Sequence, residues 1–202
     1  MEEKDYLKDI QDIRSMMAQS SQFISLSGLS GILAGIYALI GAFIANFLIE
    51  NDRSYYITYD SPTFQLLILI ALGVLFLSVV TAYLLTVKKA KKLGEQVWNP
   101  TSRRLIVNFS IPLATGGIFT LLMLKNGYFL IIAPITLIFY GLACVNASKY
   151  TLRDVRYLGI TQIVLGLIAI EFPGYGLHFW AVGFGICHIL YGSIMHYKYD
   201  IN

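Results

Sequence analysis

The chain has 202 residues, which suffices for one domain or two small ones. Apolar residues make up 56% of the chain and charged residues only 13%, whereas an average soluble domain is about 25% charged. So few charges cannot cover the surface of a soluble protein of this size. The composition therefore excludes a cytosolic globular enzyme, a disordered chain and a free nucleic-acid-binding domain. This composition indicates an integral membrane protein. The net charge of the chain is small, at +3.

Stretches without Asp, Glu, Lys or Arg mark the expected membrane spans. A spanning helix needs about 20 mostly apolar residues, and its backbone groups must bond internally because lipid offers no partners. Of six such stretches, five are long enough to cross a bilayer, and the fifth in chain order, residues 157–170, is short. We therefore predict an all-α, polytopic membrane bundle of six transmembrane helices, at residues 22–49, 63–87, 104–124, 127–149, 155–171 and 175–197.

The basic residues predict the orientation of the bundle. Of the 15 Lys and Arg residues, only Arg53 and Lys125 fall on one side of the predicted spans. Basic residues are enriched in cytoplasmic loops, so we expect both termini in the cytoplasm. The basic cluster at residues 88–104 lies between two apolar runs. We interpret it as a cytoplasmic loop beside anionic lipid headgroups, and not as a nucleic-acid site.

Residues 1–21 are too polar to span the membrane and form a separate part of the chain from the six-helix transmembrane domain at residues 22–202. Their apolar residues recur at helical spacing opposite an acidic face: Tyr6, Ile10, Ile13 and Met17. This pattern predicts a cytoplasmic amphipathic helix. We expect its apolar stripe to lie against the protein's own cytoplasmic loops, and the alternatives are a cytoplasmic protein partner or a dimer contact.

The first predicted span carries a stripe of small residues: Gly31, Ala34, Gly35 and Ala38. Such a stripe lets two helix backbones approach closely. We expect it to pack within the chain, against the glycines of the last span, and a homodimer seam is the alternative. The pattern also suggests an internal repeat, because two sets of residues align at one constant offset: Gly28, Ser30, Ile32, Gly35 and Ala38 with Gly159, Thr161, Ile163, Gly166 and Ala169.

Polar side chains inside the spans are candidates for function, because such groups are costly in lipid. No Asp, Glu, Lys or Arg lies deep in a predicted span. His188, near mid-membrane, is the main candidate for a ligand contact or a protonation switch, and the structural alternative is a hydrogen bond to Gln162 or Tyr191. The full set of candidates for a ligand site or a polar pathway is His188, Gln162, Asn108, Asn146 and Tyr191.

Near the outer surface, Glu171 and His178 flank one tight turn, and we interpret them as a hydrogen-bonded pair that fixes the hairpin. Two ligands do not make a zinc site, which needs three or four. All three histidines lie in the last predicted span, too far apart along its axis for two of them to hold one haem within one chain. We therefore predict no metal, no cofactor and no catalytic residue.

Pro112 and Pro134 lie within the third and fourth predicted spans. Proline removes a backbone donor and kinks a helix, so we expect both helices to bend there. Broken helices line transporter sites, but kinks are also ordinary in membrane proteins.

Two stretches carry a family resemblance: residues 13–41 and residues 147–166, the second of which contains Ser-Lys-Tyr-Thr-Leu-Arg-Asp-Val-Arg-Tyr-Leu-Gly. They resemble a group of uncharacterised six-helix bacterial inner-membrane proteins. The resemblance implies a multi-pass protein of the bacterial inner membrane, and no activity travels with it.

Three functions remain open at this point. The leading one is a non-enzymatic bundle that binds a small apolar or amphipathic ligand, or a partner, between its helices. The second is a small transporter or channel, expected to be dimeric, and the third is a membrane enzyme with a metal or haem site. A solvent-connected cavity at His188 favours transport, a closed apolar pocket favours ligand binding, and a filled bundle favours a scaffold or assembly role.

Overall fold

The computed structural model describes residues 22–52, 60–94 and 96–201, so the predicted helix at residues 1–21 lies outside the described residues. The described chain is helical and, apart from one isolated bridge, contains no β-structure. The elements are, in chain order, α2 (Gly28–Asn51), α3 (Pro62–Lys92), α4 (Pro100–Lys125), the short 3₁₀ turn η1 (Phe129–Ile131), α5 (Ile132–Ala147), α6 (Asp154–Glu171), α7 (Gly176–Trp180), the π-helical segment η2 (Ala181–Cys187) and α8 (His188–Tyr199).

Five helical stretches are long and apolar enough to cross a membrane, which confirms a multi-pass helical architecture. They are Gly28–Asn51, Pro62–Lys92, Pro100–Lys125, Phe129–Ala147 and Gly176–Tyr199. The last stretch joins α7, η2 and α8 into one rod. The sixth helix, α6, has 18 residues and carries Asp154, Arg156 and Glu171 near its ends, so its apolar part is shorter. A sixth span therefore stays a prediction.

The first span begins six residues later than its charge-free sequence predicts. Residues 22–27 are not helical, and Phe23 forms an isolated parallel bridge with Thr151. The Phe23 amide donates to the Tyr150 carbonyl at 2.8 Å, and the Thr151 hydroxyl donates to the Phe23 carbonyl at 2.8 Å. The predicted start at residue 22 was wrong because the backbone of this segment finds its partners in the α5–α6 loop instead of in a helical turn.

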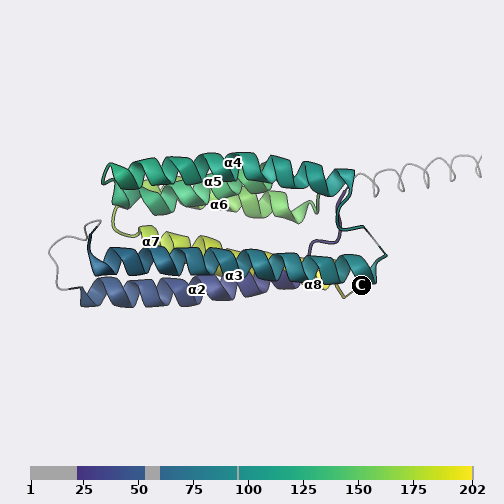
Figure 1. The fold of residues 1–202 in the computed structure, drawn as a ribbon, viewed down its shortest axis with the longest axis horizontal. Helices are drawn as coiled ribbons and strands as arrows, with labels where there is room; N and C mark the ends of the chain where they lie inside the picture. The colour runs from purple at the N-terminus through teal and green to yellow at the C-terminus, as the bar shows by residue number, and fades with distance from the viewer. Residues whose placement is uncertain (1–21, 53–59, 95, 202) are drawn as a thin grey trace, which may run out of the picture.

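The helices run side by side along one long axis, with α4, α5 and α6 on one side and α2, α3 and α8 on the other (Figure 1). The most extensive contacts join α5 with α6, α2 with α8, α4 with α5, and α2 with α3. Helices α3 and α4 are consecutive in the chain but make no comparable contact. Ala90 is the one fully buried residue of α3, and the others are half-buried or exposed, because α3 packs against α2 but not against α4.

Glycines let two helix pairs pack backbone to backbone. A Cβ atom built on Gly35 of α2 would lie 2.6 Å from the carbonyl oxygen of Gly185, and Gly31 of the same helix faces Gly192. In the second pair, a Cβ on Gly166 of α6 would lie 2.9 Å from the carbonyl oxygen of Pro134 in α5. The stripe at residues 31–38 thus packs inside the chain, where Ala38 is buried and Ala34 half-buried.

The two glycine contacts repeat the same geometry. Gly28, Gly35, Gly185, Ile189 and Gly192 of the α2–α8 pair correspond to Gly159, Gly166, Pro134, Ile138 and Gly141 of the α5–α6 pair, with the same neighbours in each. We call these two contacts the closed seams. The equivalence pairs α2 with α6 at the predicted offset of 131 residues, but it pairs α8 with the earlier helix α5, so the internal repeat along the chain stays a prediction.

Candidate functional site

The buried polar cluster of the bundle centres on His188, at the start of α8. Its Nε2 atom lies 2.7 Å from the Tyr140 hydroxyl oxygen, and its Nδ1 atom lies 3.1 Å from the Gly183 carbonyl oxygen. A carbonyl only accepts, so Nδ1 carries the proton and Nε2 accepts from Tyr140. A neutral imidazole therefore has both ring nitrogens bonded inside the bundle.

Gln162 of α6 binds the same carbonyl group. This side chain is fully buried, and its Nε2 donates to the Gly183 carbonyl at 2.7 Å. Its Oε1 has no hydrogen-bond partner among the described residues, and a Cβ built on Gly183 would lie 2.5 Å from that atom. The Gln162 amide ties the π-helical segment η2 to α6, and the His188 imidazole ties the same rod to Tyr140 of α5. A side chain at Gly183 would have to displace Gln162 and Leu137.

Aromatic rings pack around this cluster. Tyr140 lies 5.0 Å from Phe184 between ring centroids, and Phe184 stacks on His188 at 5.8 Å and also contacts Trp180. Sequence reasoning missed Tyr140. Its signal was available, because a lone hydroxyl in the middle of an apolar run needs a partner.

Asn108 and Asn146, two further candidates from the sequence, meet between α4 and α5. The Asn146 side-chain amide donates to the backbone carbonyl of Asn108 at 2.8 Å. Pro112 lies four residues after Asn108 and has no N–H to give to that carbonyl. The amide of Asn146 therefore replaces the backbone donor that the proline removes. Pro134, in contrast, lies in the first turn of α5, where a missing N–H costs no helical hydrogen bond.

The remaining sequence candidates lie apart from the His188 cluster. The Tyr191 hydroxyl lies 3.2 Å from the Thr161 hydroxyl, and no hydrogen bond of the described residues joins it to His188. Glu171 and His178 are both exposed, and the described ion pairs do not join them. Among the described residues, no group of three His, Cys, Asp or Glu side chains is placed to hold a metal ion.

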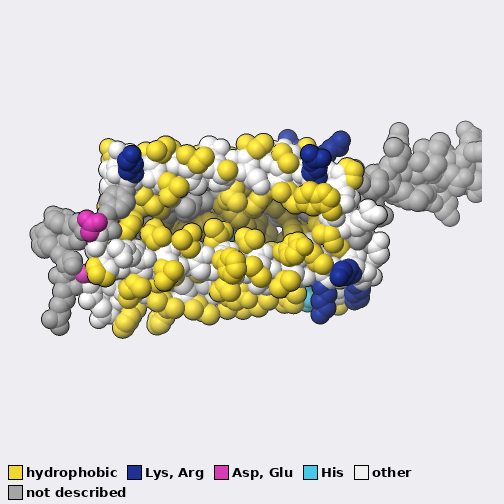
Figure 2. Space-filling view, in the orientation of Figure 1, with side chains coloured by type: hydrophobic (Ala, Val, Ile, Leu, Met, Phe, Trp, Pro, Cys, Tyr) yellow, Lys and Arg dark blue, Asp and Glu magenta, His cyan; other side chains and the backbone are white. Residues whose placement is uncertain are grey.

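Helices α3 and α4 leave an opening between them. Figure 2 shows a hollow between these two helices, with hydrophobic side chains along both sides. Each helix has a glycine at which nothing lies within 4 Å of a built Cβ atom, Gly73 in α3 and Gly117 in α4. We call this opening the α3–α4 seam, and it contrasts with the two closed seams.

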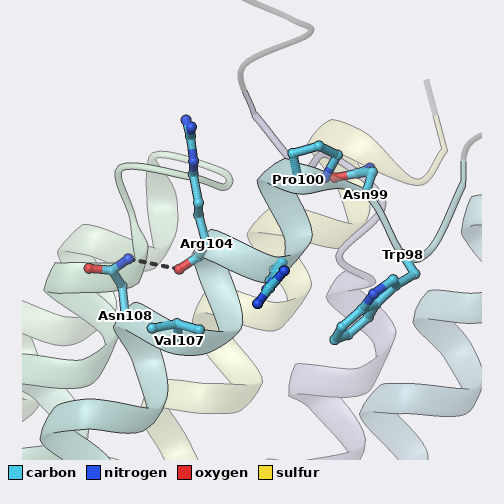
Figure 3. Close-up of a pocket in the computed structure, with 7 residues that line it drawn as sticks. Trp98, Asn99, Pro100, Arg104, Val107 and Asn108 are labelled. Carbon is cyan, nitrogen blue, oxygen red and sulfur yellow. Dashed lines mark hydrogen bonds between the residues drawn. The ribbon is translucent and has the colours of Figure 1, made fainter.

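A shallow depression of about 550 Å³ lies at one end of the α3–α4 seam. Its lining residues come from the α3–α4 loop and the first two turns of α4: Trp98, Asn99, Pro100, Arg103, Arg104, Val107 and Asn108. In Figure 3 the ring of Trp98 stands apart from α4, to its right, while the Arg104 side chain points away along the helix axis. We call this depression the basic mouth, and the end of the bundle that carries it the basic end. Neither His188 nor Gln162 lines it.

Asp200 ties three helices together at the basic end. One carboxylate oxygen lies 2.6 Å from Lys89 Nζ, near the end of α3. The other accepts from the Gly28 amide at 3.0 Å, at the start of α2, and lies 2.8 Å from His196 Nδ1 of α8. Burial raises the pKa of Asp200, but hydrogen bonds from Lys89 and His196 and the charge of Lys89 outweigh it, so this pKa lies below its ordinary value.

No protein-family model, curated protein or solved structure matches this chain.

Proposed function

We propose that this protein is a non-enzymatic membrane protein that holds an amphipathic ligand in the α3–α4 seam. In this proposal it resides in the bacterial inner membrane, with the basic end toward the cytoplasm. One observation carries the proposal: two long, apolar helices that follow each other in the chain do not pack against each other. The ligand would lie between them, with its polar group at the basic mouth.

The closed seams explain why an unpacked pair of helices suggests a ligand. Membrane helices associate through van der Waals contact, and small residues allow it. The α2–α8 and α5–α6 pairs use glycines in this way, whereas no described glycine joins α3 to α4. An apolar gap inside a bilayer is not left empty, because its lining would lose dispersion contacts on one side. An apolar chain from the membrane is the natural filling.

The polar residues of the spans favour a binding role over transport. His188 bonds to Tyr140, and both His188 and Gln162 bond to the Gly183 carbonyl. None of these side chains lines the basic mouth. Asn146 repairs the backbone beside Pro112. These groups serve the bundle itself, so the transporter alternative has less support. A homodimer and a cytoplasmic partner at residues 1–21 stay predictions.

Native mass spectrometry of gently released protein tests the proposal. The decisive variant is Val107→Trp, which fills the basic mouth with an indole, and the matched control is Val164→Trp on α6. The two valines are 49% and 48% exposed, so both replacements add the same bulk to a similar surface. The proposal predicts a bound amphiphile on the wild type and the control, and its loss from Val107→Trp. Equal retention by all three, or a bare wild-type protein, would contradict it.

A further inference from the structure

Two arginines in the basic mouth have no carboxylate partner among the described residues. Arg103 and Arg104 lie in the second turn of α4 and line the depression. The described acids at this end of the bundle are already engaged, because Asp200 pairs with Lys89 and Asp154 pairs with Lys198. The unpaired charge is therefore concentrated where the apolar seam ends.

Other basic residues add to this positive field. Lys91 and Lys92 lie in the last turn of α3, on the other side of the seam, and no described ion pair includes either of them. The N-terminus of α4 adds no specific contribution to this field. The backbone N–H groups of Asn99 and Ser102 there already donate to each other's side chains. The charge of the basic mouth itself thus comes from Arg103 and Arg104, and Lys91 and Lys92 at the end of α3 add positive charge outside its lining.

Trp98 gives the basic mouth an interfacial character. It is 67% exposed and lies in the loop that joins α3 to α4. Tryptophan is enriched where lipid headgroups meet acyl chains, because its ring is apolar and its N–H is polar. Figure 3 shows this ring on the seam side of the basic mouth, below the level of Pro100. An acyl chain and a headgroup would therefore meet beside Trp98.

We propose that the ligand is an anionic phospholipid, with its phosphate at Arg103 and its acyl chains along the α3–α4 seam. Arg104, whose side chain points away along the helix axis, adds positive charge at the rim of the basic mouth. This inference rests on the proposed function and specifies the class of ligand. A guanidinium group binds phosphate oxygens through two parallel hydrogen bonds. A lipid with a net negative headgroup also gains from Lys91 and Lys92, whereas a zwitterionic headgroup offsets that gain with its own cation.

Fluorescence of Trp98 measures this preference. The chain has two tryptophans, so Trp180→Phe leaves Trp98 as the only one. The variant is placed in bilayers of brominated phosphatidylcholine, which quenches a neighbouring indole, and unbrominated phosphatidylglycerol is added in steps. Phosphatidylglycerol that occupies the site displaces the quencher. The inference predicts that fluorescence recovers as though phosphatidylglycerol bound at least about fivefold more tightly than phosphatidylcholine, because one basic residue near a surface contributes about that factor.

Charge variants separate a site from a general surface effect. In the Trp180→Phe background, Arg103→Gln with Arg104→Gln should remove the preference, so that recovery follows the mole fraction of phosphatidylglycerol. The matched control is Arg156→Gln, an exposed basic residue on α6 that should leave the preference unchanged. A preference that is absent in the parent variant overturns the inference. So does a preference that falls equally in the Arg156→Gln control.

The two proposals fail in different ways. If phosphatidylglycerol has no advantage but Val107→Trp still loses a bound amphiphile in the mass spectrum, the seam binds a ligand and the anionic class is wrong. If Val107→Trp retains the amphiphile as the wild type does, the seam is not the site and both proposals fail.

Discussion

The side-chain amide of Asn146 donates a 2.8 Å hydrogen bond to the backbone carbonyl of Asn108, the carbonyl that Pro112 leaves without its helical donor. Two asparagines that the sequence marks as pathway candidates thus form one interhelical contact between α4 and α5. The contact has a clear physical reason, because lipid supplies no hydrogen-bond partner for a freed carbonyl. This contact allows Pro112 to stand in the middle of α4, one of the two helices that border the α3–α4 seam.

Replacing Asn146 by leucine should destabilise the bundle, and removing the proline should reduce that loss. Asn146→Leu leaves the Asn108 carbonyl unbonded, so we expect the free energy of unfolding to fall by about 1 kcal/mol. In a Pro112→Ala background the alanine N–H can bond the same carbonyl, and Asn146→Leu should cost less. Unfolding of detergent-solubilised protein by added SDS measures all four members of this cycle. An equal loss in both backgrounds would refute the repair role of Asn146.

Alanine at Gly192 should disturb the α2–α8 seam, whereas alanine at Gly117 should not. A Cβ on Gly192 would lie 2.6 Å from the backbone nitrogen of Ile32, so the two helices must separate. Overpacking of this kind costs about 1–3 kcal/mol. At Gly117 nothing lies within 4 Å, and alanine should gain up to about 1 kcal/mol of helix propensity. The same SDS titration compares the two variants. Equal free energies of unfolding for both would show that the α2–α8 seam is not tightly packed.

The His188–Tyr140 hydrogen bond should contribute to stability through coupling between the two residues. Tyr140→Phe leaves the Nε2 atom of His188 without a donor, which we expect to cost about 1–3 kcal/mol. In a His188→Leu background the same change should cost much less, because no acceptor remains. A double-mutant cycle of unfolding free energies gives the coupling. Native mass spectrometry of Tyr140→Phe should still show the bound amphiphile, and its loss would place the ligand at His188 instead of in the α3–α4 seam.

Asp200 should make the stability of the bundle depend on pH in the acid range. Its pKa is lower in the folded protein than the ordinary value of about 3.9, so the ionised carboxylate stabilises the fold above that pH. This contribution is lost as the pH falls through the folded pKa. Asp200→Asn should therefore lower the melting temperature at neutral pH, and its difference from the wild type should shrink in strong acid. Melting curves from about pH 7 down to about pH 2 test this, and a pH-independent difference would contradict it.

The membrane character and the approximate position of each long helix could be predicted from the sequence, because a charge-free stretch is a local signal. The errors came from contacts that are not local. Residues 22–27 lack charge but bond to the α5–α6 loop, more than a hundred residues away. Pro134 looked like a kink because the sequence did not place the start of α5 at Ile132.

The candidate site was predicted less well, for a related reason. His188 and Gln162 were both named from their polarity, and both bind Gly183. Tyr140 was missed because an aromatic residue in a span was counted as apolar, although its hydroxyl bonds to His188. The α3–α4 seam left no signal in the sequence. Composition shows that both helices are apolar, but only their packing shows that they stay apart.

A photoreactive benzoylphenylalanine at Val107, with the same group at Val164 of α6 as reference, tests the central claim most directly. Light links the probe to whatever lies within reach, and mass spectrometry identifies the product. An occupied α3–α4 seam predicts that Val107 yields phospholipid adducts, richer in anionic lipid than those from Val164. A cross-link from Val107 to α3 of the same chain would show that the seam is closed, and a cross-link to a second copy would show that another protomer fills it. Either result would contradict the account.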